Sequence, residues 1–403
     1  MTADVVVVGG GILGCSAALH LARRGVDVVL LERDDVAQGT SPAGAGFVGE
    51  WAAGWVPGLG PEELELERYG LAFYAELQAN GHDVGWRGNG NLYLATTDES
   101  FEAFCAPLAD QDVVSDAKVL SAHEVGEVTS GVVDETEIVG GVLHPAGGRV
   151  SASKAALAVA AEAREAGARI ETRTPVTRIA VRGARVTGVE TGRGPIAAAR
   201  VIVAAGAWTN ALLRPLGCWL PMAPLVAIRA VTEPLGIPPT MPTLMAREVP
   251  VYVREDDGAL LWGSSFERRP RHDFVDADAP ERLTQLPLDG YFEMRHALPA
   301  TERMVPALAR ASSVTIALGV PTYTADRRAL LGPVPGVDGL DVIAGCNEAG
   351  ISHGPGYGRL TADVVAGVVD ESALEPFRID RFGDAIGSGR DVMRALRPTV
   401  AAR

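Results

Sequence analysis

The first residues with a defined chemical task are three glycines near the start of the chain. Residues 9–14 read GGGILG, which fits the pattern GxGxxG between an apolar strand and a helix. Gly9 permits a tight turn, Gly11 lets a pyrophosphate approach the backbone, and Gly14 lets the helix pack closely on the strand. The unpaired amides of the helix N-terminus attract the phosphate oxygens. The spacing therefore predicts a dinucleotide site.

An acidic residue stands where such a site holds a ribose. Glu32 ends the second apolar strand, after the glycine motif. A carboxylate there accepts hydrogen bonds from both ribose hydroxyls and disfavours the 2′-phosphate of NADP. The motif alone does not separate FAD from NAD. Two later segments favour FAD: residues 201–208 form an apolar strand that ends in small residues, and residues 345–354 join a buried strand to another helix N-terminus.

The elements that must position this site alternate along the chain. Residues 5–8, 12–24 and 28–31 predict a strand, a helix and a strand. Further expected elements are helices over residues 62–79 and 153–166, strands over residues 90–96, 176–181, 185–190, 201–204 and 340–344, and a helix from Pro355 to about Val368. Because α/β segments occur at the start, middle and end, with strand-rich segments between them, we expect two interleaved domains.

Composition restricts the classes of function. The chain has 403 residues and a formal net charge of −15, which argues against nucleic-acid binding. The N-terminus lacks the basic region of a signal peptide, and no apolar run reaches about 18 residues, so we expect a cytoplasmic protein without a membrane span. None of the four cysteines forms a CxxC pair, so neither a metal site nor a disulfide framework is expected.

Several segments, in order along the chain, resemble the glycine/sarcosine/D-amino-acid oxidase (DAO) superfamily of FAD enzymes. Besides the glycine motif with Glu32-Arg33, they are GTSPAGAGFV at 39–48, GWRGNGNLYLAT at 85–96, VETGRGPIAAARVIVAAGAW at 189–208, PTYTADRRALLGP at 321–333 and GLDVIAGCNEAGISHGPGYGRLTADVVAG at 339–367. They span nearly the whole chain and are specific to the superfamily, not to one substrate.

The resemblance implies an α/β fold with two interleaved domains. A Rossmann-like FAD-binding domain of the glutathione-reductase type is expected over residues 1–82, 145–215 and 335–403. A strand-rich α+β substrate-binding domain is expected over residues 83–144 and 216–334.

The resemblance also implies which residues contact FAD. They are Gly9, Gly11, Ile12, Leu13, Gly14, Glu32, Arg33, Thr40, Ser41, Ala45, Gly46, Val176, Ala204, Ala205, Gly206, Trp208, Gly350, Ile351 and Ser352. The last three lie where the family's helix N-terminus faces the pyrimidine end of the flavin. The partial positive charge of a helix N-terminus favours the negatively charged reduced flavin.

Two departures from the superfamily affect the expected chemistry. Some relatives attach FAD through a cysteine or a histidine, but Pro321 lies close to the first position, and Pro42 and Ala43 occupy the region of the second, so we expect non-covalent FAD. Cys346, nearby in sequence, is expected to be a packed thiol.

The basic residues with which relatives hold a substrate carboxylate are also absent. Pro321, Ser352 and residues 49–50 stand at those positions. Either another arginine binds the carboxylate, Arg254, Arg327 and Arg328 being nearest by motif, or the substrate has no small free carboxylate.

A few residues are candidates for contact with the substrate. They are His353, Tyr252, Arg254 and Glu348 as catalytic candidates, and Trp51 and Trp55 as an apolar wall. His353 directly follows the flavin-facing turn and would handle a proton or bond the substrate. Glu348 would pair with a substrate ammonium. Each has a structural alternative: a packed histidine, a solvated carboxylate, a surface arginine or simple aromatic packing.

The expected reaction is oxidation of a C–N bond in an amine or amino acid, by hydride transfer to flavin N5. The imine then hydrolyses, and molecular oxygen or another acceptor reoxidises the flavin. Two alternatives stay open: a 2-hydroxy-acid oxidoreductase, and a non-catalytic flavin-binding subunit of a complex.

The scarcity of lysine bears on oxygen chemistry. Lys118 and Lys154 are the only lysines among 36 basic residues, and neither lies near a flavin-facing motif. Sarcosine-oxidase-like relatives place a lysine on the strand corresponding to residues 260–263, which read LLWG here. Oxidase activity would therefore need another cation, such as His353 or an arginine.

Overall fold

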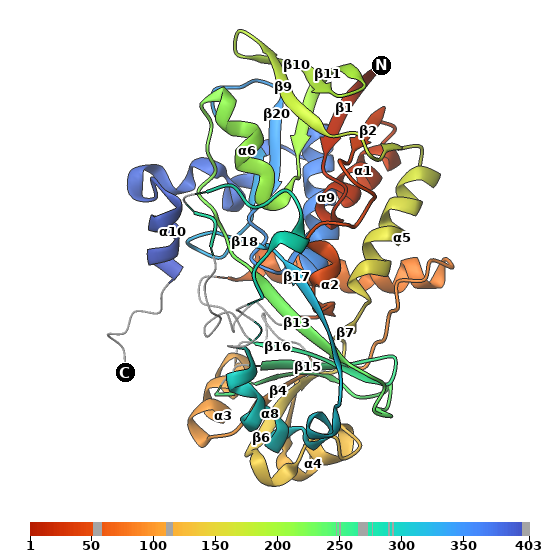
Figure 1. Cartoon of the computed structure of the whole chain (residues 1–403), viewed down its shortest axis with the longest axis vertical. Helices are drawn as coiled ribbons and strands as arrows, with labels where there is room; N and C mark the ends of the chain where they lie inside the picture. The colour runs from red at the N-terminus through yellow and green to blue at the C-terminus, as the bar shows by residue number, and fades with distance from the viewer. Residues whose placement is uncertain are drawn as a thin grey trace.

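The computed structural model describes residues 1–50, 59–109, 116–246, 248–249, 251–264, 273–275, 277–288, 291 and 294–396. These residues build two large sheets, one toward each end of the long axis, with helices packed against them (Figure 1). The predicted mixed α/β class is thus confirmed. Among the helices of these ranges, none is long and apolar enough to cross a lipid bilayer.

The first sheet, sheet A, is mainly parallel and has the strand order β19-β20-β11-β1-β2-β8, with β10 and β9 continuing from β11. Its strands are β1 (Thr2–Val8), β2 (Val28–Leu31), β8 (Arg169–Glu171), β9 (Val176–Arg182), β10 (Arg185–Thr191), β11 (Gly194–Val203), β19 (Leu330–Pro333) and β20 (Leu340–Ala344). Residues 5–8 and 201–203 are buried, as expected for parallel strands covered on both faces. Val8 lies beside Leu31 and Val203, so the carboxyl ends of β1, β2 and β11 meet at one edge.

Helices α1 (Ile12–Arg23), α2 (Pro61–Ala79), α5 (Ala152–Glu165) and α9 (Gly350–Val365) share one apolar core with sheet A. Glycines bring α9 close to both of its neighbours. A Cβ atom at Gly358 would lie 2.5 Å from the carbonyl carbon of Ser16 in α1, and one at Gly70 in α2 would lie 2.1 Å from the carbonyl oxygen of Ser352. Helix α9 is therefore held by close backbone packing on two sides.

The second sheet, sheet C, has the strand order β17-β13-β16-β15-β14-β4-β6-β5. Its strands are β4 (Asn91–Ala95), β5 (Lys118–Ser121), β6 (Gly140–His144), β13 (Ala227–Thr232), β14 (Thr243–Ala246), β15 (Val251–Asp256), β16 (Ala259–Ser264) and β17 (Val314–Gly319). Helices α3 (Asp98–Cys105), α4 (Ala122–Val128) and α8 (Leu298–Met304) lie by this sheet in Figure 1. β4 and β14, from distant segments, pair in parallel.

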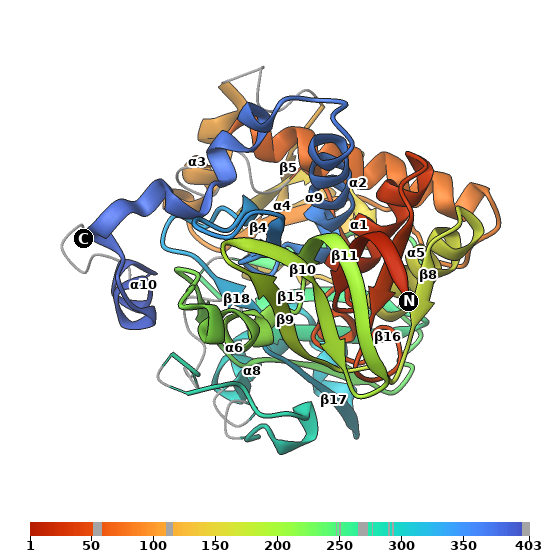
Figure 2. The ribbon, with the colours of Figure 1, turned by 90° about the horizontal axis from the view of Figure 1, so that it is seen from above.

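Smaller elements complete the described fold. They are β3 (Phe47–Val48) with β7 (Gly148–Arg149), β12 (Ala223–Pro224) with β18 (Thr322–Tyr323), α6 (Thr209–Leu213) and α10 (Gly389–Leu396). Seen from above, α10 lies at the periphery of the described fold, far from β1 and β11 (Figure 2). The substrate-binding segment was expected to end at residue 334. Residues 330–333, which form β19, instead pair antiparallel with residues 341–344 of β20 and so belong to sheet A.

Helix α9 begins earlier than the sequence predicts. The expected start was Pro355, but the helix begins at Gly350 and contains Pro355 in its second turn. Proline has no N–H to bond the carbonyl four residues earlier, which here belongs to Ile351. The hydroxyl of Tyr74, from α2, donates to that carbonyl oxygen at 2.8 Å. A side chain from another helix thus replaces the lost helical bond.

Candidate active site

The glycine turn between β1 and α1 has room for a ligand but not for side chains. Gly9 has a φ of +115°, and a Cβ atom there would lie 2.5 Å from the carbonyl oxygen of Ala204. A Cβ atom at Gly14 would lie 1.9 Å from the carbonyl oxygen of Gly9. Gly11, the N-cap of α1, brings no side chain to the first amides of the helix. This backbone geometry fits a pyrophosphate.

Glu32 lies at the end of β2, beside the turn. Its carboxylate accepts hydrogen bonds from the backbone N–H of Gly10 (2.5 Å) and of Asp34 (2.9 Å). These bonds fix the carboxylate at the cavity edge, and a carboxylate keeps further lone pairs for ribose hydroxyls. On the same side, the guanidinium of Arg33 lies over the ring of Trp208, 4.1 Å from its centroid.

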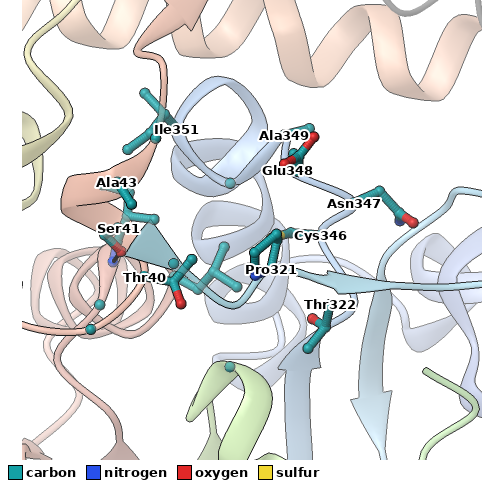
Figure 3. Close-up of a pocket in the computed structure, with 18 of the residues that line it drawn as sticks. Thr40, Ser41, Ala43, Pro321, Thr322, Cys346, Asn347, Glu348, Ala349 and Ile351 are labelled. Carbon is teal, nitrogen blue, oxygen red and sulfur yellow. Dashed lines mark hydrogen bonds between the residues drawn. The ribbon is translucent and has the colours of Figure 1, made fainter. Parts of the chain in front are cut away.

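One cavity of about 670 Å³ runs from Glu32, past the glycine turn, to sheet C. Its size lies within the range of about 300–1,000 Å³ that is common for ligand pockets. The residues expected to contact FAD line it, apart from Gly14, which packs against Gly9 instead. Figure 3 shows Thr40, Ser41 and Ala43 on one side and Cys346 and Asn347 on the other. The glycine cradle and the volume of the cavity fit FAD.

The turn from β20 into α9 is tightly constrained. Asn347 and Glu348 have φ values of +51° and +68°, a left-handed backbone that is costly for residues other than glycine. The Asn347 side chain stabilises it by accepting from Thr324 N (2.9 Å) and donating to Gly345 O (2.6 Å). The first turn of α9, with Gly350 and Ile351, consequently lines the cavity without a side-chain cap.

His353 lies in the first turns of α9 and lines the cavity. Its ring stacks on Tyr357 at 5.7 Å between centroids, and its Nε2 lies 4.0 Å from Oε1 of the buried Glu67. Burial lowers the pKa of His353 to about 4. The imidazole is therefore neutral at neutral pH, and can accept a hydrogen bond through one nitrogen and donate through the other.

The other catalytic candidates separate into two kinds. Tyr252 and Glu348 line the cavity, and the ring of Phe47 meets that of Tyr252 edge to face at 5.6 Å. Arg254 does not belong to the cavity lining. Its guanidinium donates to Ala45 O (2.5 Å), and also bonds Glu255 O (2.7 Å) and Asp256 Oδ1 (2.8 Å).

The candidate arginines, tryptophans and cysteine lie in different environments. Arg327 lines the cavity, whereas Arg328 forms an ion pair with the buried Glu63 at 3.1 Å. Trp51 and Trp55 lie outside the described residues. Cys346 lines the cavity, and burial raises the pKa of its thiol to about 11, so it is protonated at neutral pH.

The cavity is also lined by side chains that no sequence motif indicated. They are Phe47, Leu59, Glu63, Tyr93, Phe104, Met245 and Tyr357. Tyr93 and Phe104 pack at 5.4 Å between ring centroids. The strand segment at residues 90–96 was predicted, but no short pattern tells which of its residues faces a ligand.

Glu63 and Glu67 are buried one helical turn apart on α2, where an amphipathic pattern predicts exposed acids.

Residues 4–364 match the model of the DAO family, described as FAD dependent oxidoreductase. The chain belongs to this family. The match confirms the expected superfamily and FAD as its cofactor.

Individual relatives agree with this assignment. The chain is 30% identical, over 97% of its length, to the mitochondrial pyruvate dehydrogenase phosphatase regulatory subunit of Mus musculus, and covers 44% of that protein. It is 31% identical, over 94% of its length, to 4-methylaminobutanoate oxidase (formaldehyde-forming) of Paenarthrobacter nicotinovorans, and covers 45% of it. The chain thus spans less than half the length of these relatives. The structure of glycine oxidase from Geobacillus kaustophilus is 27% identical, with a TM-score of 0.80, covering 94% of this chain and 99% of that chain.

Proposed function

We propose that this chain oxidises the C–N bond of an amine or amino acid with bound FAD, and that its substrate carries an N-methyl group. The observation that carries the proposal is the continuity of one cavity between the glycine turn and Tyr252 on sheet C. The relative that matches 94% of this chain at 31% identity is named for a methylamino acid and for the formaldehyde that it forms. This name supports the N-methyl group.

FAD would be held along sheet A without a covalent bond. Gly9 and Gly11 would accommodate the pyrophosphate, and Glu32 the ribose of the adenosine. The first turn of α9 would face the flavin, where its unpaired amides favour negative charge. Among the described residues, Cys346 is the one cysteine that lines the cavity. The raised pKa of its thiol makes it a poor nucleophile at neutral pH.

At the substrate end, the chain's residues would position the amine and exclude water. The aromatic rings of Phe47, Tyr93, Phe104 and Tyr252 form an apolar wall that suits the methyl groups and, through their π faces, an ammonium ion. The hydroxyl of Tyr252 and the neutral imidazole of His353 would bond the polar part of the substrate. Glu348 would attract the cationic amine, which must lose its proton before oxidation.

The chemistry that bound FAD supplies is acceptance of a hydride from the carbon beside the nitrogen. The neutral amine thereby loses two electrons and one proton as a hydride and becomes an iminium ion. Water then adds to the iminium carbon, and the adduct breaks at the C–N bond to release an aldehyde and the protonated amine. For an N-methyl substrate the aldehyde is formaldehyde. Holding the C–H bond in one orientation is the main contribution that we assign to the protein.

A substrate panel tests the proposal. The FAD-loaded protein would be mixed without air with N-methyl amines, N-methyl amino acids, unsubstituted amino acids and 2-hydroxy acids, and the visible flavin absorbance followed. We expect bleaching with an N-methyl compound, with formaldehyde as a product. Bleaching by 2-hydroxy acids alone would favour the first alternative. No bleaching by any compound would favour a non-catalytic role, a possibility raised by the similarity to a regulatory subunit.

Admitting air after bleaching classifies the protein further. Rapid recovery of absorbance would indicate that molecular oxygen serves as the electron acceptor. Recovery with an artificial acceptor but not with air would indicate a dehydrogenase.

A further inference from the structure

A half-buried arginine on sheet C, Arg229, has no role in the function proposed above. Arg229 of β13 lies directly opposite Gly263 of β16, and Gly263 lies opposite Tyr252 of β15. Directly opposed residues share one face of a sheet, so Arg229 and Tyr252 lie on the same face. A Cβ atom at Gly263 would lie 2.2 Å from the hydroxyl oxygen of Tyr252. The phenol tip thus occupies the space over Gly263, between the strands of Tyr252 and Arg229.

Arg229 crosses from sheet C to the loop of residues 42–46. Its Nε donates to the carbonyl oxygen of Ala43 (3.1 Å) and its Nη2 to that of Pro42 (2.8 Å). Ala43 lines the cavity and is seen there beside Thr40 and Ser41 (Figure 3). The guanidinium therefore lies directly behind one wall of the cavity.

Arg254 binds the same loop, which allows the two arginines to be compared. Its Nε donates to Ala45 O (2.5 Å), and its charge is compensated by Asp256 at 2.8 Å. Beside it, the buried Arg149 pairs with the buried Glu255. Both compensated arginines thus have a carboxylate of their own.

For Arg229, no carboxylate in the described part of the chain lies within 4.0 Å, and its hydrogen bonds there go to carbonyl oxygens. Burial lowers the pKa of Arg229, while Tyr252 and Asp256 raise it. A guanidinium stays protonated in proteins. The described cluster of three arginines and two carboxylates consequently carries one excess positive charge. Partly buried charges such as this one are screened by salt much less than exposed ones.

We propose that Arg229 is a positioning residue that supplies positive potential to the flavin end of the cavity and holds the loop of residues 42–46 in place. Negative charge that arises in the cavity when bound FAD is reduced is stabilised by this cation, together with the N-terminus of α9. The inference rests on FAD binding, which belongs to the proposed function, but not on the identity of the substrate.

The test is the midpoint potential of the FAD-loaded protein, measured against reference dyes without any substrate. Arg229→Gln keeps a hydrogen-bond donor for the loop but removes the charge. We expect the ratio of reduced to oxidised flavin, at a fixed potential, to fall about tenfold, which is ~30 mV for a two-electron couple. Arg229→Lys keeps the charge, and its ratio is expected to stay within about threefold of the wild type.

A third variant acts in the opposite direction and does not depend on whether Arg229→Gln folds. Asp256→Asn removes a compensating negative charge near Arg229, so the ratio of reduced to oxidised flavin is expected to rise. An unchanged potential in Arg229→Gln, equal shifts in the Gln and Lys variants, or a fall in Asp256→Asn would each overturn the proposal. A wild-type protein that binds no FAD would instead overturn the proposed function.

Discussion

The two ends of the cavity are lined by different parts of the chain, one by backbone atoms and the other by side chains. At the nucleotide end, backbone atoms of consecutive residues form the surface: the turn at residues 9–14 excludes even a methyl group at two positions. At the proposed substrate end, side chains from distant elements line the cavity, with Phe47 on β3, Tyr93 on β4 and Tyr252 on β15. Backbone surfaces recognise what all members of a family share, here the cofactor. Side-chain surfaces can change one residue at a time and so set the substrate.

The largest effect is expected from a side chain placed in the backbone surface. In Gly14→Val, the Cβ atom would lie 1.9 Å from the carbonyl oxygen of Gly9, and neither backbone segment can move without separating α1 from β1. We expect loss of bound FAD, measured as flavin absorbance per chain after purification.

The matched control is Gly192→Ala. Nothing lies within 4 Å of a Cβ atom at Gly192, so the variant should bind FAD as the wild type does. If Gly14→Val keeps full FAD occupancy, the backbone end of the cavity does not hold the cofactor.

A smaller effect is expected at the side-chain end. Tyr252→Phe removes one hydroxyl from the cavity wall while keeping the ring contact with Phe47. The loss of one hydrogen bond to the substrate costs about 0.5–1.5 kcal/mol, or up to about tenfold in the rate of flavin reduction. Rapid mixing without air measures that rate, and FAD occupancy should not change.

Tyr69→Phe is the control for this variant. Its hydroxyl bonds His20 at 3.2 Å, away from the cavity lining, so flavin reduction should proceed at the wild-type rate. Equal rates in wild type and Tyr252→Phe would remove Tyr252 from the substrate contact.

Buried histidines predict sensitivity to acid that extends over both ends. Burial lowers the pKa of His20 to about 3 and of His144 and His353 to about 4, against about 6.5 for an exposed histidine. Below pH 6.5 the unfolded chain binds more protons than the native one, so the free energy of unfolding falls as pH drops from 6.5 to 4. Above pH 7 these groups contribute no slope.

Urea unfolding at several pH values measures this slope. Each fully buried histidine contributes up to about 1.4 kcal/mol per pH unit in that window. His353→Gln should therefore unfold with a shallower pH dependence than the wild type. An unchanged slope would show that His353 is protonated in the native state.

A further effect, on stability alone, concerns the helix that joins the two ends. Tyr74→Phe leaves the carbonyl of Ile351 without the hydroxyl that compensates for Pro355, at a cost of about 1–2 kcal/mol of unfolding free energy. In a Pro355→Ala background the restored N–H bonds that carbonyl, so Tyr74→Phe should cost less there. Additive losses in the double-mutant cycle would contradict this coupling.

The difference between the two ends also explains what could be predicted from the sequence. The strand–turn–helix unit is local, and its glycines at fixed spacing indicate backbone contacts directly. The fold class followed from the alternation of apolar runs. The same local information placed the helix of residues 62–79 close to the observed Pro61–Ala79.

The remaining features depend on contacts between remote segments. The early start of α9 at Gly350 is supported by Tyr74, far away in the sequence, because its hydroxyl replaces the helical bond that Pro355 cannot donate. The burial of Glu63 depends on Arg328 in the same way. Arg229 lies in a strand-like segment with no motif, and its contact with residues 42–43 arises only when sheet C meets this cavity-lining loop.

The central claim is that the two ends form one continuous site for FAD and an amine. The direct measurement is a single turnover without air, in which one equivalent of an N-methyl amine from the panel is mixed with FAD-loaded protein. We predict that one flavin is bleached, and one formaldehyde formed, for each equivalent added. Formation of formaldehyde without bleaching, or bleaching without an aldehyde product, would contradict it.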